Sequence, residues 1–228
     1  AWLQTNAVLG LSVVALGAFI GSFLITILVF RLSTSTLGTS VTTMLLAGIA
    51  ISALGGAVNS LLSYFADNEM LRQISIWQMG NLSTANWTRV SIVAVVAVVV
   101  LILFPRESKS LNALLLGESE ARHLGIDVQR VKKKLILLTT LGIGTAVAVA
   151  GMIGFVGLIV PHIVRLLIGP DHRWLLPVSA LAGGILLLIA DTLARVIIAP
   201  AELPTGILTA ILGAPFFIML LIQQRREF

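Results

Sequence analysis

The sequence has 228 residues and a net charge of +5; 57% of the residues are apolar and only 11% are charged. Soluble domains usually carry about 25% charged residues. The composition, with a mean hydropathy of +1.04, therefore excludes an ordinary water-soluble domain and indicates a membrane protein. The absence of cysteine excludes a disulfide framework, a thiolate metal site and a cysteine nucleophile.

Apolar segments follow one another along the chain, separated by charged residues or by clusters of Pro, Gly, Asn and Ser. A helix of about 20 residues crosses a hydrocarbon layer of about 30 Å, and the apolar runs are continuous rather than alternating. We therefore expect an all-α, polytopic transmembrane bundle that forms one domain over residues 1–228. The expected spans are 7–31, 42–65, 88–104, 135–152, 154–168, 174–199 and 205–222.

The segment 154–168 is shorter than the others and contains Pro161 and His162. Backbone that departs from a full helix is tolerated at membrane depth only where other parts of the protein surround it. We expect this segment to be either a tilted, broken span or a half-helix buried among the other spans.

The positive charges predict the orientation. With seven spans and a cytoplasmic C-terminus, the inner loops hold twelve Lys and Arg side chains, and the outer loops hold only Arg72 and Arg89. Short cytoplasmic loops are enriched in Lys and Arg, so we expect the C-terminus and the loop 105–134 inside and the loop 66–87 outside. The basic composition then reports topology rather than nucleic-acid binding.

Catalytic signatures are missing from the sequence. It contains no zinc-protease motif, nucleophile elbow or phosphate-binding loop, and its three histidines are scattered. Asp191 is the only acid well inside a span, so paired intramembrane carboxylates are also excluded. We expect no catalytic residue, no metal site and no cofactor bound by this chain.

Asp191 and Arg195 lie four residues apart in the span 174–199, on one helix face. Each charge alone costs about 2.5–3.5 kcal/mol at the bilayer centre, so we expect the two to pair near the outer interface. Two interpretations remain open: a self-neutralising pair, or a pair in which Arg195 also meets a carboxylate of an outside partner.

Many of the 20 glycines lie inside the spans, where small residues let helix backbones approach closely. Glycine and proline interruptions are also a weak pointer to discontinuous helices beside substrate paths. Gly213 with Pro215 and the stretch from Pro200 to Pro204 are the candidates, and kinks that only serve packing are the alternative.

The loop 105–134 carries the clearest functional pattern. Its core, 117–128, opens with Glu118 and Glu120, as a helix N-terminus prefers, breaks at Gly125 and resumes toward Lys132. We expect two short helices that dock a cytoplasmic partner; a merely solvated loop is the alternative. The apolar side chains expected to make contact are Ala121, Leu124 and Ile126.

Eight motifs follow one another along the chain, at 45–50, 71–73, 77–80, 117–125, 151–162, 190–195, 202–206 and 212–217. Together and in this order they resemble the FecCD-type permeases, the membrane subunits of ATP-driven importers for ferric siderophores, haem and cobalamin. The resemblance covers nearly the whole chain. Family members have about ten spans, and the first span here resembles the fourth, so we expect about three N-terminal spans to be missing, through truncation, processing or a chain that is given only in part.

The resemblance implies a mechanism of alternating access in the bacterial inner membrane. Two permease chains, identical or related, would enclose a path; two ATP-binding subunits carrying ATP and Mg²⁺ would dock inside, and a substrate-binding protein would dock outside. For coupling to the ATPase, the resemblance implies Gly117, Glu118, Glu120, Ala121, Arg122, Leu124 and Gly125. For the translocation path it implies Ser40, Val41 and Thr42, to which the glycine pattern adds Gly213 and Pro215. For docking of the binding protein it implies Arg195 and Glu202.

An iron chelate, siderophore or haem, is the expected cargo, with cobalamin as the alternative. An ion-coupled secondary transporter is disfavoured because the spans contain one acid and no relay of carboxylates or histidines. An intramembrane enzyme is disfavoured by the missing motifs.

Overall fold

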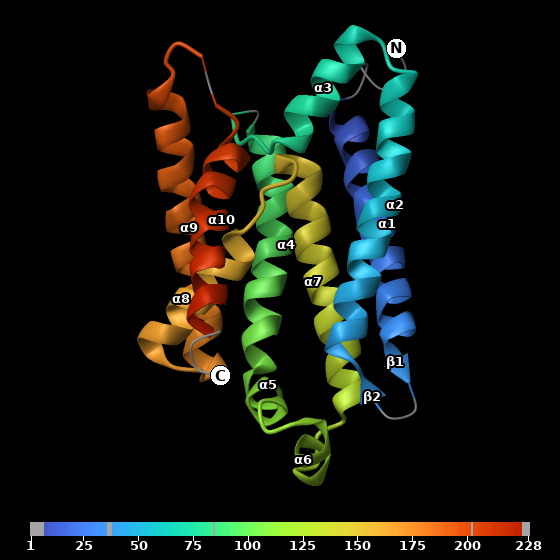
Figure 1. Cartoon of the computed structure of the whole chain (residues 1–228), viewed down its shortest axis with the longest axis vertical. Coiled ribbons are helices and arrows are strands. Elements are labelled where there is room, and N and C mark those ends of the chain that lie inside the picture. Colours follow the sequence, from blue (N-terminus) through green and yellow to red (C-terminus); the bar gives the residue numbers. More distant parts are fainter. Residues whose placement is uncertain (1–6, 36–37, 84, 202, 225–228) are drawn as a thin grey trace.

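The computed structural model describes residues 7–35, 38–83, 85–201 and 203–224, and within them the chain is a bundle of ten helices (Figure 1). The long helices coincide with the seven expected segments, which confirms the helical membrane-bundle class. They are α1 (Ala7–Ser33), α2 (Val41–Tyr64), α4 (Trp87–Arg106), α7 (Val128–Ala150), α8 (Val156–Ile168), α9 (His172–Ile197) and α10 (Thr205–Gln224).

Among the described residues, four helices are long and apolar enough to cross a membrane: α2, α4, α7 and α9. Their outward side chains are mostly apolar and exposed, as expected when lipid rather than water is the solvent. α7 is the central element, because α1 and α4 both pack along it, while α8 packs on α9 and α10 packs against both.

Short elements connect these helices at the two ends of the bundle (Figure 1). A hairpin of two-residue strands, β1 (Thr34–Ser35) and β2 (Gly38–Thr39), joins α1 to α2. α5 (Ser108–Leu114) and α6 (Glu118–His123) lie between α4 and α7, at the same end, which we call the α6 end. α3 (Asn68–Gln78) lies at the opposite end, which we call the α3 end; α3 and α5 were not predicted.

Successive long helices run in opposite directions, so each end of the bundle is formed by alternate loops (Figure 1). The basic side chains are distributed unequally between these two ends. Within the described residues, the α3 end carries three basic side chains, Arg72, Arg89 and Arg195. The basic side chains at the α6 end are Arg31, Arg106, Lys109, Arg122, Arg130, Lys132, Lys133, Lys134, Arg165 and Arg173.

The segment 154–168 forms a half-helix, as one of the two expected alternatives has it, but only one face of this helix is buried and Leu158, Leu166 and Leu167 are exposed. α8 has 13 residues, about 20 Å at 1.5 Å per residue, and non-helical backbone at 151–155 leads into it from the end of α7. Val160 and Val164 of α8 pack against Leu175 of α9 in a buried cluster. α10 continues through Gly213 and Pro215, so the discontinuous helix is not found there, and a kink that serves packing remains of the two expected interpretations.

Candidate functional site

The segment 117–128 folds as α6 followed by a tight turn into α7. Gly117 and Gly125 have φ values of 107° and 81°, a region in which glycine carries no steric penalty, so these two residues set the bends on either side of α6. The Ile126 N–H donates to the Ala121 carbonyl at 3.0 Å and closes the turn. Asp127 then caps α7 by accepting a hydrogen bond from the Arg130 N–H. The second of the two predicted helices is therefore the start of α7.

The apolar side chains of this segment divide between two faces. Ala121 is fully buried and packs with Ala113 of α5 and Val128 of α7, and Ile126 packs on the same cluster. Ala121 and Ile126 therefore pack α5, α6 and the start of α7 together from inside, which corrects the expectation that they face a partner. Leu124 is 63% exposed. The adjoining Leu115 and Leu116, which sequence reasoning missed, are also exposed.

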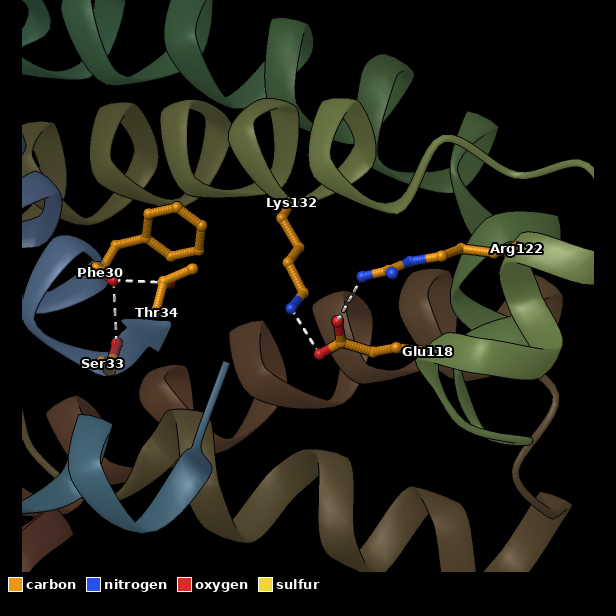
Figure 2. Close-up of polar contacts among 6 residues, drawn as sticks. All are labelled: Phe30, Ser33, Thr34, Glu118, Arg122 and Lys132. Carbon is orange, nitrogen blue, oxygen red and sulfur yellow. Dashed lines mark hydrogen bonds and ion pairs between the residues drawn. The ribbon is translucent and has the colours of Figure 1, made fainter. Parts of the chain in front are cut away.

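The charges of α6 also have distinct positions. The Glu118 carboxylate lies between the Lys132 ammonium group, at 2.5 Å, and the Arg122 guanidinium, at 3.7 Å (Figure 2). Lys132 comes from α7, so this pair braces α6 against the long helix behind it. Glu120 is exposed and has no ion pair among the described residues. Glu118 therefore supports the unit, and Glu120 faces outward.

A second polar cluster ties α5 to the start of α9. The Asn112 amide nitrogen donates to the Asp171 carboxylate at 2.7 Å, and the Asn112 amide oxygen accepts from the His172 backbone N–H at 2.9 Å. Asp171 also caps α9 through the Arg173 N–H. The hydrogen bonds from the Arg173 N–H and from the Asn112 amide hold the pKa of the Asp171 carboxyl below its ordinary value. Asp171 alone reads as a helix cap, but nothing in the sequence links it to Asn112.

At the α3 end, Asp191 has two partners. Arg195 donates to one carboxylate oxygen at 2.8 Å, and the Thr205 hydroxyl donates to the other at 3.0 Å. Thr205 is fully buried at the first turn of α10, where Leu208 packs with Ala190 and Ala194 of α9. The expected helix-internal pair is therefore confirmed, and the carboxylate also fixes α9 to α10.

Three glycines meet in a backbone junction beside this pair. The Gly206 N–H donates to the Gly80 carbonyl at 3.1 Å, and the Asn81 N–H donates to the Ala150 carbonyl at 2.8 Å. A Cβ at Gly206 would lie 2.1 Å from the Met79 carbonyl oxygen, and one at Gly151 would lie 2.2 Å from the Trp77 carbonyl oxygen. Only glycine permits such approaches. The motifs 77–80, 151–162 and 202–206 therefore come together at one place in the structure.

The described residues contain no group of three or more His, Asp or Glu side chains that could hold a metal ion. A cavity of about 180 Å³ lies between α8, α9 and α10, and its lining is apolar apart from Thr209. Such a lining can pack helices or accept apolar groups, and it offers no nucleophile with a neighbouring base.

The sequence profile of the FecCD transport family matches residues 2–223, nearly the whole chain. The chain belongs to the FecCD transport family. Within this FecCD chain the motif 117–125 consists of α6 and the glycines that flank it, which we call the α6 unit. The motif 190–195 contains the Asp191 and Arg195 pair.

Relatives of this FecCD chain include transport permeases. The hemin transport system permease protein HmuU of Yersinia pestis is 49% identical over 92% of this chain and 63% of its own length. The vitamin B12 import system permease protein BtuC of Vibrio cholerae is 42% identical over 92% of this chain and 61% of its own length. The chain thus spans about 60% of the length of these curated relatives.

A solved structure has a closely similar fold. It is described as an inward-facing conformation of a metal-chelate type ABC transporter, and it matches with a TM-score of 0.79 at 33% identity. The match covers 92% of this FecCD chain and 72% of the solved chain.

The remaining predicted residues lie apart from one another in this FecCD chain. Ser40 caps α2 at the α6 end by accepting from the Thr43 N–H, and Thr42 is exposed; the side chain of Val41 is outside the described part. Gly213 lies in α10, on the other side of the bundle in Figure 1, where a Cβ would lie 2.4 Å from the Phe155 Cβ. Pro215 is exposed, and Glu202 lies outside the described residues.

Proposed function

We propose that this chain is part of the transmembrane permease subunit of an ATP-driven importer that moves an iron chelate, siderophore or haem, across the inner membrane by alternating access. Membership of the FecCD transport family and the haem permease among its relatives support this function. The chain itself is not an enzyme in this proposal: ATP and Mg²⁺ bind to the partner subunits, which carry out hydrolysis.

The α6 unit is the observation that carries the proposal. It projects from one end of the bundle, is packed inside by Ala121 and is braced on α7 by the Glu118 pair with Lys132 (Figures 1 and 2). A rigid projection with exposed Leu124 and Glu120 can transmit a movement of an ATP-binding subunit to the long helix α7.

We place the α6 end in the cytoplasm because most of the basic side chains lie there. The C-terminus is then cytoplasmic, and the α3 end faces the substrate-binding protein. Single cysteines in this cysteine-free chain test the orientation. A cysteine at Glu120 should react with a membrane-impermeant maleimide only in inverted vesicles, and one at Glu69 only in intact cells. Labelling of position 120 from outside would overturn both the orientation and the transport function.

The remaining partners follow from the same proposal. A second permease chain, identical or related, encloses the path together with this one, and two ATP-binding subunits contact the two α6 units. Ser40, Val41 and Thr42, at the start of α2, narrow the path toward the cytoplasm, and Gly213 and Pro215 belong to it on α10. Arg195, at the α3 end, acts together with Glu202 in docking the binding protein.

The test is ATP-dependent uptake by the assembled transporter in proteoliposomes. The transporter that contains this chain, with its ATP-binding subunits and binding protein, should accumulate haem or a ferric siderophore when ATP and Mg²⁺ are supplied, and not with a nonhydrolysable analogue. Uptake that follows an ion gradient without ATP would instead favour a secondary transporter.

Cobalamin import is the second candidate, because BtuC proteins from several organisms share 41–46% identity with this chain. Growth of an uptake-deficient strain on a panel of ferric siderophores, haem and cobalamin separates the two. Growth restored only by cobalamin would replace the iron chelate as cargo and leave the ATP-driven mechanism intact.

A further inference from the structure

The Asn112 side chain makes a connection that the coupling motif itself does not contain. Its nitrogen donates to Asp171, and its oxygen accepts from the His172 backbone N–H and lies 2.7 Å from the His172 Nδ1. The ionised Asp171 carboxylate can only accept, which places the amide nitrogen toward it and the amide oxygen toward His172. The His172 Nδ1 must therefore carry a hydrogen. One amide thus joins α5 to two successive residues of another helix start.

The Asn112 contacts join other helices than the ion pair between Glu118 and Lys132 does. Glu118 ties α6 to α7 through Lys132, whereas Asn112 ties α5 to the turn between α8 and α9. α5 and α6 are one packed unit through Ala113 and Ala121. The unit therefore holds two long helices at once, α7 by an ion pair and α9 by hydrogen bonds.

α9 in turn is fixed at its far end. Asp191 accepts from the Thr205 hydroxyl there, so the helix is held by Asn112 at the α6 end and by α10 at the α3 end. Leu175 in its first turn packs against Val160 and Val164, so α8 moves with the start of α9. A displacement of α5 along the membrane plane must act on this helix pair.

We propose that Asn112 is a positioning residue that transmits movement of the α5–α6 unit to α9 through Asp171 and His172. The inference rests on the permease function proposed above. Three short contacts from one planar amide resist both sliding and rotation of α5 against α9, so a tilt imposed on α6 reaches the α8–α9 pair as well as α7.

Exchanging the amide of Asn112 and the carboxylate of Asp171 tests the positioning role of Asn112. Asn112→Asp places two carboxylates against each other and breaks the contact between α5 and Asp171. Asp171→Asn alone keeps an oxygen that accepts from Asn112 and from the Arg173 N–H, so it should be mild. The double variant N112D/D171N restores the contact between the two helices with donor and acceptor exchanged, and the new carboxylate at position 112 still accepts from His172. It gives up the Arg173 N–H cap of α9, because that N–H and the Asn112 amide share one Asp171 oxygen. Asn86→Asp is the matched control, because Asp also caps α4.

The measurement is the amount of haem taken up per ATP hydrolysed by the assembled transporter in proteoliposomes. N112D should lower this ratio at least tenfold, with hydrolysis and complex yield within twofold of wild type, and the double variant should recover it to within threefold. The inference would be overturned by any of three results: an unchanged ratio in N112D, no recovery of the ratio in the double variant, or a parallel loss of ATP hydrolysis, uptake and complex yield in N112D. Absence of ATP-dependent uptake in the wild type would instead count against the proposed function.

A distance measurement keeps the inference testable without uptake. Cysteines at Lys109 of α5 and Trp174 of α9, both exposed, can carry spin labels because the chain has no native cysteine. The label distance should stay constant on ATP addition to the wild-type complex and should shift or broaden in N112D. Identical distributions in N112D and wild type, with and without ATP, would show that Asn112 does not couple the two helices.

Discussion

The Thr205 hydroxyl donates to the Asp191 carboxylate at 3.0 Å and joins the first turn of α10 to the last third of α9. Thr205 is completely buried, while Arg195 occupies the other carboxylate oxygen from the exposed side. The acid therefore has two roles. It neutralises a charge in its own helix, and it fixes the relative position of two helices beside the glycine junction.

Replacing Thr205 by Val should destabilise the protein. The two side chains have nearly the same shape, so the change removes the hydroxyl and leaves an Asp191 oxygen without its buried donor, at about 1–3 kcal/mol. Thermal unfolding in detergent should show the loss as a lower Tm. Thr192→Val is the control, because the Thr192 hydroxyl is exposed and only bonds the Leu188 carbonyl of its own helix. Equal midpoints for the two variants would contradict the bridging role of Thr205.

Replacing Gly206 by Ala should also destabilise the protein, although Ala is the better helix former by about 1 kcal/mol. The new Cβ would lie 2.1 Å from the Met79 carbonyl oxygen, and backbone on both sides cannot move aside cheaply. We expect a loss of about 1–3 kcal/mol, seen as a Tm lowered by several degrees. Gly184→Ala in α9 meets no atom within 4 Å and should keep or raise the Tm. A Gly206→Ala protein as stable as wild type would show that the junction is loosely packed.

The α6 unit should respond differently to changes at its two acids. Glu118→Gln weakens the ion pair with Lys132, so it should lower both the Tm and the amount of substrate taken up per ATP hydrolysed. Glu120→Lys reverses an exposed charge at the start of α6, at a cost of about 0.3–1 kcal/mol, and should instead weaken binding of the ATP-binding subunits with little change in the Tm. Co-purification and calorimetry distinguish the two outcomes. Intact binding and uptake in Glu120→Lys would remove Glu120 from the docking surface.

Gly125 gives a separate test of the same unit. Its φ of 81° strains any β-branched residue, although a Cβ there would meet no neighbour within 4 Å. Gly125→Val should therefore reorient α6 by backbone strain alone and uncouple ATP hydrolysis from uptake while the chain still inserts. Gly125→Asn, which tolerates this region better, should be milder. Normal uptake per ATP in Gly125→Val would indicate that the segment is only a tether.

The spans were predictable because each is a continuous apolar run that lipid must surround, and even the short α8 was recognised from Pro161 and its length. α3 escaped because its sequence, from Asn68 to Gln78, is polar on average and lies at an end of the bundle. Its cap was visible all the same: Asp67 accepts from the Met70 N–H, the pattern expected at a helix start.

Parts of the candidate site were less accessible to sequence reasoning. A run of residues does not tell which face of a short helix is buried, so Ala121 was assigned outward when it packs inward. The contact between Asn112 and Asp171 spans 59 residues, and the junction at Gly206 depends on three segments far apart in the chain. Asp191 and Arg195, in contrast, lie four residues apart in one helix and could be paired from their spacing.

The two interpretations of Arg195 predict different affinities of the transporter for its binding protein. If Arg195 only balances Asp191, then a change at either residue should leave the affinity for the substrate-binding protein alike. If Arg195 also docks the substrate-binding protein, Arg195→Glu should weaken binding of that protein at least tenfold, because a long side chain at the interface can pair with a carboxylate on the partner. Asp191→Asn is the matched variant, since Asn removes the charge but keeps an oxygen that can accept from Thr205.

Affinity of the reconstituted transporter for its binding protein, measured by surface plasmon resonance, decides between them. Asp191→Asn should keep the affinity within about threefold, because an exposed pair contributes only about 0–1 kcal/mol. Arg195→Glu should lose affinity and regain part of it with a Glu→Arg change on the binding protein. An exchange of the two residues is less informative, because an arginine at position 191 would also deprive Thr205 of its acceptor. Equal affinities for Arg195→Glu and Asp191→Asn would leave the pair with a purely structural role.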